Sequence, residues 1–158
     1  MTDEKRQEYT LRITQANQSQ LVVILYDLFF EYTGQAVEEL SKGNRQAYSE
    51  QLDRAQDVLS ELILSLNMDQ DPAPAIYRVY LYVSARIGQA RGSLKSEGLK
   101  DPLRMMHSLC DTYREDAKSD TSGPVMDNSQ KVYAGLTYGR DSLNESMDEG
   151  SGSRGFFV

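Results

Sequence analysis

The sequence predicts an all-α protein, an antiparallel up-down four-helix bundle with a short N-terminal arm and a flexible C-terminal tail. Three observations support this fold class. Apolar residues recur three and four positions apart through four successive segments, which is the spacing of a buried helix face. Short runs rich in Gly, Asn, Asp and Pro separate these segments. After Lys118 the composition changes to Ser, Asp, Gly and Asn, which is typical of a chain without a packed core.

The first helix is expected from Asn17 to Lys42, with Asn17 as its N-terminal cap. From Leu21 to Phe30 the side chains are apolar on every side, so this helix should be covered on two or more sides and lie centrally. Asp27 is the only charged residue in that run. Because an unpaired buried carboxylate is costly, Asp27 should face a helix end, an arginine or a partner protein, and Arg86 is a candidate.

The second helix is expected from Asn44, which should cap it, to about Asn67, after Gly43 has closed the first helix. A second apolar stripe through Val58 and Ile63 lies beside the main one. The main stripe predicts a bundle seam and consists of Tyr48, Leu52, Ala55, Leu59, Leu62 and Leu66.

The third helix follows the segment D-Q-D-P-A-P, in which the prolines break the helical pattern. Pro74 is expected in its first turn, and the helix should stop near Gly98. Asp101 should then cap a fourth helix, and Pro102 is a favourable first residue for it. This helix is expected to end near Ser119. The predicted seams consist of Ile76, Tyr80, Val83, Ile87, Ala90 and Leu94 in the third helix and of Leu103, Met106, Cys110, Tyr113 and Ala117 in the fourth.

Composition narrows the possible functions of the chain. Its 158 residues are enough for one domain, which we expect at residues 1–119, followed by a flexible tail at 120–158. One cysteine cannot form an internal disulfide, the polar start lacks the apolar stretch of a secretory signal, and no apolar run could span a bilayer. We therefore expect a cytoplasmic protein. A net charge of -7 and a pI near 4.7 argue against nucleic acid as a partner and against stable membrane association.

Enzymatic chemistry lacks the residues that it would need. His107 is the only histidine, so neither a zinc site nor the paired Glu-x-x-His motifs of a di-iron bundle can be formed. No glycine-rich phosphate loop is present, and Cys110 lies on the seam of the fourth helix as a small core thiol. We expect no enzyme activity, no catalytic residue, no metal and no cofactor.

Several short motifs, in the same order and spacing, resemble the flagellar export chaperone family FliS. The opening motif comprises Tyr9, Ile13-Thr14, Ala16-Asn17, Leu21 to Leu25 and Tyr26-Asp27. Similar motifs follow at Ala55 to Leu62, at Ile76-Tyr77 with Tyr80, Tyr82, Arg86-Ile87 and Ala90, and at Tyr113-Arg114-Glu115. The sequence departs from the family pattern in having Leu28 for a Gly, Gln18 for a Pro and no Trp in the fourth helix.

The resemblance implies a cytoplasmic chaperone whose partners are the disordered C-terminal segment of flagellin and the flagellar export apparatus. It would prevent premature polymerisation of flagellin and deliver the subunit for export. In the family the N-terminal arm can lie over part of the client site, and the second and third helices carry more apolar residues than one seam needs. The partner-binding residues expected on these grounds are Tyr9, Ile13, Gln56, Val58, Glu61, Ile63, Asn67, Tyr77 and Leu81.

Two alternatives use the same apolar surface differently. It could pack a second layer or a homodimer, so that the protein acts as a non-enzymatic adaptor or regulator that binds itself or another folded protein. A small helical enzyme based on His107 and Cys110 is the other alternative. In the tail, the apolar segment from Val132 to Tyr138 could dock on the protein's own bundle, or could occupy the client groove as a built-in competitor.

Overall fold

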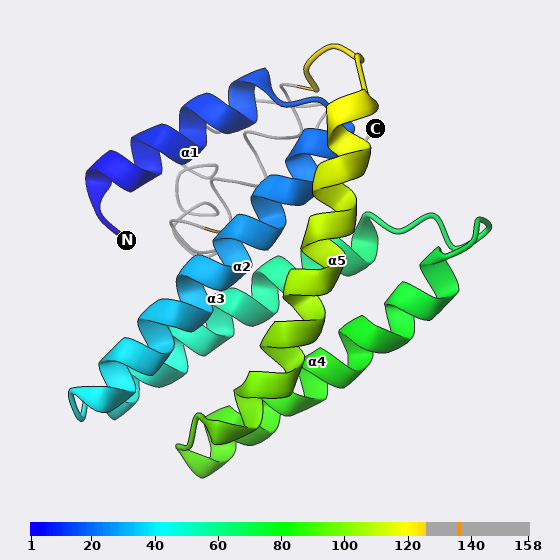
Figure 1. The fold of residues 1–158 in the computed structure, drawn as a ribbon. Coiled ribbons are helices and arrows are strands. Elements are labelled where there is room, and N and C mark those ends of the chain that lie inside the picture. Colours follow the sequence, from blue (N-terminus) through cyan, green and yellow to red (C-terminus); the bar gives the residue numbers. More distant parts are fainter. Residues whose placement is uncertain (126–135, 137–158) are drawn as a thin grey trace, which may run out of the picture.

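The computed structural model describes residues 1–125 and Leu136, and this part of the chain is helical with no strand. The all-α class is therefore confirmed for the described residues. The helices are Asp3–Gln15 (α1), Gln18–Ser41 (α2), Arg45–Leu64 (α3), Ala73–Ser93 (α4), the short 3₁₀ helix Glu97–Leu99 (η1) and Lys100–Ser119 (α5), as Figure 1 shows.

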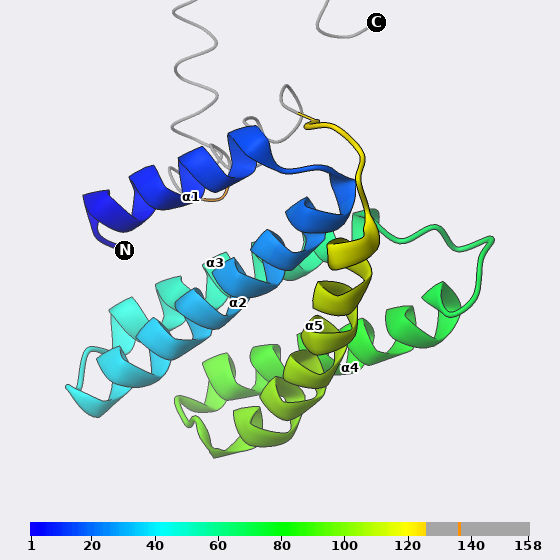
Figure 2. The same cartoon turned by 45° about the horizontal axis from the view of Figure 1, so that its top comes forward.

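Helix α2 is the central element of the fold. It runs beside α3 in the opposite direction, α4 returns along α3, and α5 runs back across α2 and α4 (Figures 1 and 2). Helix α1 lies against α2, on the side away from α4. The apolar run from Leu21 to Phe29 is buried except at Asp27, as expected for a helix that is covered on several sides.

Local capping explains where the first helices begin. The Asn17 side chain accepts a hydrogen bond from the Gln20 N–H at 2.8 Å, and the Gln20 side chain accepts one from the Asn17 N–H at 3.0 Å. This reciprocal capping box confirms the predicted start of α2. Pro74 lies in the first turn of α4, also as predicted. Asn44 occupies the N-cap position of α3 but forms no capping bond, because its side chain donates to Glu39 Oε2 at 2.6 Å instead.

The N-terminal arm differs from the prediction because it is itself a helix. Thr2 caps α1 by accepting from the Lys5 N–H at 3.3 Å, and Asp3 and Glu4 stand at the positive end of the helix dipole. Helix α1 buries Tyr9 and Ile13, and its remaining surface is largely polar.

Helix ends in the second half of the chain also differ from the prediction. Helix α3 ends at Leu64, three residues before the expected Asn67. Helix α4 ends at Ser93 instead of near Gly98, because Leu94 adopts a left-handed conformation with φ of 55°. Helix α5 then begins at Lys100, so Asp101 lies inside its first turn and does not cap it.

A buried tyrosine pair joins α2 to α4. The hydroxyls of Tyr26 and Tyr80 share a hydrogen bond in the core, and the Tyr113 ring of α5 lies 5.5 Å from the Tyr26 ring, centroid to centroid. Burial raises the pKa of Tyr26 and of Tyr80, so both phenols stay protonated. The packing of α2 against α4 and α5 therefore includes a satisfied polar contact.

Within the described residues, no helix combines the length and apolar character needed to cross a bilayer.

Candidate functional site

Helices α3 and α4 each carry a row of side chains in line with one contact that joins the two helices. Gln56 Nε2 of α3 donates to Ser84 Oγ of α4 at 2.7 Å, which fixes the register of these antiparallel helices. Two helical turns further along α3 lies Ile63, and two turns back along α4 lies Tyr77. By this register Ile63 and Tyr77 stand at the same level of the two helices, and Leu81 lies between Tyr77 and Ser84 on the same face of α4. We call Gln56, Ile63, Tyr77 and Leu81 the α3–α4 strip.

The strip is open to solvent and largely apolar. The Leu81 side chain is 46% exposed, while Ile63 and Tyr77 are half-buried, with Ile63 packed against the core. Further exposed apolar side chains stand nearby along the chain, at Leu64, Met68 and Tyr82. An elongated apolar surface with a polar end at Gln56 suits a peptide segment better than it suits a small molecule.

Five of the predicted partner-binding residues lie outside the strip, three of them on α3 or in the loop after it. Val58 is completely buried, because it lies on the opposite side of α3 from Gln56 and packs in the core. Glu61 is half-buried and does not fall on the line through Gln56 and Ile63. Asn67 is exposed in the loop after α3, where its Oδ1 accepts from the Asp69 N–H at 3.2 Å.

Tyr9 and Ile13 form a separate region on α1. Lys5 pairs with Glu31 at 2.7 Å and Arg12 pairs with Asp27, so α1 runs antiparallel to α2. This register places Tyr9 and Ile13 over the α2 surface that begins at Ile24 and continues through Leu28 one turn later. Burial, reinforced by the charge of Asp27, raises the pKa of Tyr9. Helices α1 and α4 lie on different sides of α2 (Figure 2).

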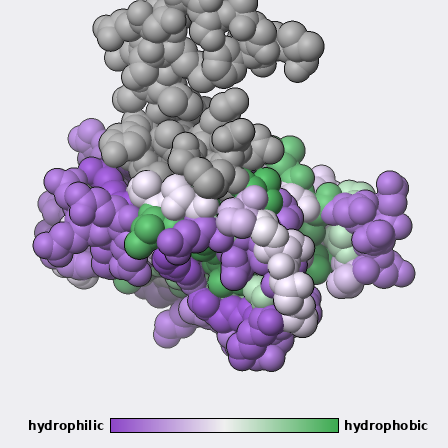
Figure 3. Space-filling model, turned by 90° about the horizontal axis from the view of Figure 1, so that it is seen from above, coloured by the Kyte–Doolittle hydropathy of each residue, from purple (hydrophilic) through white to green (hydrophobic). Residues whose placement is uncertain are grey.

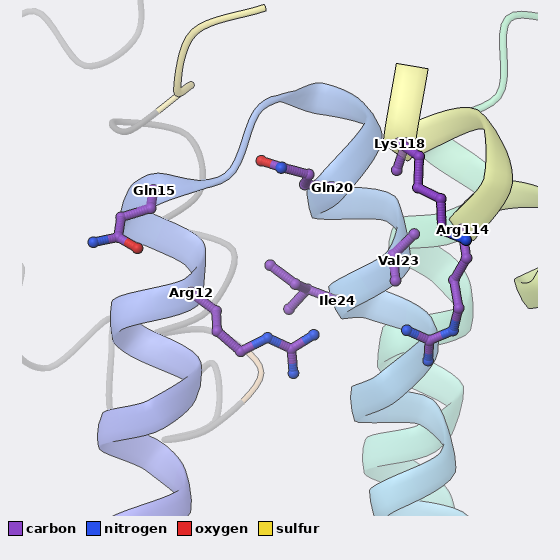
Figure 4. A pocket seen from close by; sticks show the side chains of 8 residues that line it. Arg12, Gln15, Gln20, Val23, Ile24, Arg114 and Lys118 are labelled. Carbon is purple, nitrogen blue, oxygen red and sulfur yellow. The ribbon is translucent and has the colours of Figure 1, made fainter. Parts of the chain in front are cut away.

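A cavity of about 570 Å³ opens between α1, α2 and α5 (Figure 4). Its apolar side is formed by Val23 and Ile24 of α2, which are almost fully buried, and cationic side chains of α1 and α5 border it. Sequence reasoning missed this cavity because its walls come from three separate helices. Its lining consists of Arg12, Gln15, Gln20, Val23, Ile24, Arg114, Ala117 and Lys118.

The half-buried carboxylate of Asp27 lies at the edge of this cavity and is paired there with two arginines. Arg12 of α1 donates to one carboxylate oxygen and Arg114 of α5 donates to the other, and the Asp27 side chain is 16% exposed. The expectation of an arginine partner is confirmed, but the suggested Arg86 is wrong. Arg86 instead donates to the Gly98 carbonyl at 3.3 Å, and this bond holds the Arg86 side chain against the turn after α4. Asp27 thus links α1 and α5 through α2.

A smaller apolar groove, of about 310 Å³, lies between α4 and α5. Met105 and Leu109 lie four residues apart on α5 and face Val79 of α4, with Arg104 and Ser108 at the border. The four-residue spacing was a signal in the sequence, but these residues fall beside the seam that was used to place α5.

Seen from the α1 end, the surface is mostly hydrophilic, and apolar side chains interrupt it in separate patches (Figure 3). The hydrophobic patches visible on this face are small and stand among hydrophilic residues (Figure 3).

The surroundings of Cys110 and His107, the two residues considered for catalysis, are visible in the structure. Cys110 is buried, and burial raises the pKa of its thiol, which disfavours the reactive thiolate. His107 stacks on Phe30 with the ring centroids 3.8 Å apart. Among the described residues, no group of three or more His, Cys, Asp or Glu side chains could hold a metal ion.

A family model described as flagellar protein FliS matches residues 1–120. This match spans all of the helices from α1 to α5 and stops where α5 ends. No curated protein matches the chain. Leu136 therefore lies beyond the part of the chain that the family model describes.

Proposed function

The chain belongs to the FliS family of flagellar proteins, which are export chaperones and not enzymes, and on that premise we propose which client it serves and how. The protein binds the disordered C-terminal segment of flagellin in the cytoplasm, prevents premature polymerisation and delivers the subunit to the flagellar export apparatus. Residues 1–119, with α2 to α5 as an antiparallel up-down bundle, form the chaperone domain, and residues 120–158 form a tail.

The α3–α4 strip is the observation that carries this proposal. A disordered client loses conformational entropy when it binds, so it needs a long apolar surface to compensate. A client helix can place anchors at helical spacing against Leu81, Tyr77 and Ile63. The tyrosine ring supplies apolar area while its hydroxyl stays in water, and Gln56 offers a hydrogen bond at the end of the strip.

The remaining predicted residues act around this strip. Glu61 and Asn67 lie off the line of the strip, on α3 and in the loop after it, where a carboxylate and an amide can hydrogen-bond a client that extends beyond the strip. Val58 contributes from the core side of α3, where it keeps the helix in place.

Helix α1 supplies the second part of the site. Because it buries Tyr9 and Ile13 and few other side chains, its packing on α2 is weak compared with that of α3. When α1 is displaced, the apolar surface at Ile24 and Leu28 becomes available to the client. The cavity beside α1 gives the client access to that surface at Ile24.

The proposal is tested by calorimetric titration of the full chain with a peptide covering the flagellin C-terminal segment, while circular dichroism follows helix formation. We expect saturable one-to-one binding with a gain of helix. Leu81→Ala should weaken binding about fivefold to tenfold, because it removes a half-exposed anchor that the client covers. Val37→Ala is the matched control, since Val37 is also apolar and 39% exposed but lies on α2 outside the strip.

Equal losses from Leu81→Ala and Val37→Ala would mean that the peptide adheres to apolar surface without a defined site. If the peptide does not bind and the chain sediments as a dimer, the adaptor alternative replaces the chaperone proposal. Leu64 and Met68, which are 76% and 46% exposed, are then the first residues to examine in the dimer contact.

A further inference from the structure

Leu136 makes a defined contact with the helical domain although it lies beyond the region that the family model matches. Its side chain is 6% exposed and packs with the core. Its backbone carbonyl accepts a hydrogen bond from the Tyr32 hydroxyl at 3.1 Å and another from Arg54 Nη1 at 3.4 Å. Tyr32 belongs to α2 and Arg54 to α3. We call these two residues the Tyr32–Arg54 seat.

The seat is built to receive an apolar side chain together with a carbonyl group. The Arg54 guanidinium lies 5.9 Å from the centroid of the Tyr32 ring, so the cation and the aromatic ring are held together. Tyr32 is 2% exposed, which leaves its hydroxyl dependent on an acceptor within the protein. Leu136 provides that acceptor, and its side chain provides the apolar cover.

The seat also lies at one end of α1. A small cavity of about 60 Å³ beside it is lined by Met1, Arg6, Gln51 and both seat residues. The N-terminal end of α1, α2 and α3 therefore meet beside the Tyr32–Arg54 seat.

The other end of α1 is held by the residues that follow α5. The Val125 N–H donates to the Ala16 carbonyl at 3.0 Å, directly after α1 ends. Asn17 Nδ2 donates to the Asp120 carbonyl at 3.2 Å, and Ser19 Oγ donates to the Asp120 carboxylate. Hydrogen bonds from Ser122 and Ser19 lower the pKa of Asp120 to about 2, so this anchor stays charged at neutral pH.

We propose that Leu136 is a built-in competitor of the client: it fills the Tyr32–Arg54 seat in the free protein and restrains α1, and an apolar anchor of the flagellin segment displaces it. This inference rests on the proposed function. The displacing group is a leucine-sized side chain whose own carbonyl is free to accept, as it is in the last turn of a helix. The family match covers residues 1–120, so Leu136 lies outside the part of the chain that this match describes.

The expected effect follows from the population of the open state. When only a fraction of the protein is open, the apparent dissociation constant rises by the inverse of that fraction. Burial of one leucine, reduced by the conformational entropy that this residue loses, favours the closed state by about three to ten to one. Removing the Leu136 side chain should therefore tighten client binding by about threefold to tenfold.

The test compares the full chain with Leu136→Ala and with Leu143→Ala, a matched control that makes the same substitution in the same tail. Each protein is titrated calorimetrically with the flagellin C-terminal peptide. We expect tighter binding for Leu136→Ala and unchanged binding for Leu143→Ala. Binding that is unchanged or weaker in Leu136→Ala overturns the competition and leaves the proposed function intact. Absence of binding in every protein, the unmodified chain included, overturns the proposed function and the competition together.

A second measurement needs no client. Hydrogen exchange of the α1 amides should be faster in Leu136→Ala than in the unmodified chain, because the restraint on α1 is lost. Tyr32→Phe keeps the ring and removes one donor to the Leu136 carbonyl, so it should change exchange and affinity in the same direction by a smaller amount. Unchanged exchange in α1 for both variants would refute the restraint.

Discussion

Replacing Asp27 by Asn should destabilise the protein, because Asp27 is the link between α1 and α5. The substitution keeps the shape of the side chain and removes the charge that pairs with Arg12 and Arg114. The two guanidinium groups would then remain near one another around a neutral amide that can accept at a single oxygen.

The magnitude follows from the exposure of the three side chains. A hydrogen bond to a charged group contributes about 1.5 to 3 kcal/mol when it is buried. The Arg12 and Arg114 side chains are 35% and 46% exposed, so water screens both pairs and about 1 kcal/mol each is the appropriate figure. Asp27→Asn should therefore lower the free energy of unfolding by about 2 kcal/mol, which corresponds to about 4 to 8 °C in Tm for a chain of this size.

Urea unfolding followed by circular dichroism measures this change, with Asp53→Asn as the matched control. Asp53 pairs with Arg91 at 2.7 Å, but both side chains are about half exposed, so its loss should lower the free energy of unfolding by less than about 0.5 kcal/mol. The effect of Asp27→Asn should also shrink in 1 M salt, where the screening length is about 3 Å. The reasoning is refuted if the two variants are equally stable.

Three further predictions concern other parts of the fold. Because burial raises the pKa of Tyr26 and Tyr80, their phenols lose protons at lower pH in the unfolded chain than in the folded protein. The free energy of unfolding should therefore fall above about pH 10 by about 1.4 kcal/mol per pH unit for each tyrosine, which urea titrations at alkaline pH would measure. Gly43→Ala should destabilise the protein by about 1 kcal/mol because the φ of Gly43 is +82°, whereas Gly34→Ala, on an open surface of α2, should stabilise it by about 0.5 to 1 kcal/mol. Urea midpoints of the two variants that shift in the same direction would contradict this. The Cys110 thiol, whose pKa burial raises, should react with Ellman's reagent at pH 8 only as the protein unfolds, and rapid labelling of the native state would refute its burial.

Features that depend on neighbouring residues could be predicted from the sequence. The start of α2 is set by Asn17 and Gln20, three residues apart, and both halves of that capping box form. The burial of α2 from Leu21 to Phe29 followed from its apolar side chains, among which Asp27 is the one exception. Cys110 was expected in the core and is buried there.

Features that depend on tertiary arrangement could not be predicted. The partner of Asp27 comes from α1 and α5, and no sequence pattern reveals that Arg12 and Arg114 approach it together. Helix α1 escaped detection because it buries two residues, which leaves little apolar periodicity. The end of α4 depends on Leu94 in a left-handed conformation that is more typical of glycine, so the pattern favoured Gly98.

The candidate site was predicted in part, because the sequence indicates surplus apolar residues but not how the helices pack around them. A surplus of apolar residues indicates that a helix has a second contact surface, and this reasoning identified Tyr77 and Leu81 on the exposed face of α4. It could not distinguish a surface for a client from a second packing layer inside the protein. Val58 illustrates this limit, because α3 packs against both α2 and α4 and buries a residue beside the main stripe completely.

The apolar surface of this protein is divided between an open strip and a covered face, and the division has a physical reason. A chaperone must expose apolar area to capture a disordered client, yet a large contiguous apolar patch promotes aggregation. The α3–α4 strip ends at Gln56, which bonds to Ser84 beside it, and this polar pair limits the apolar length of the strip. The α2 surface near Ile24 lies instead beneath α1, whose burial of two side chains is small enough for a client to replace. We infer that a client engages the strip first, and that the affinity gained there supplies the free energy to displace Leu136 from the Tyr32–Arg54 seat and so release the restraint on α1.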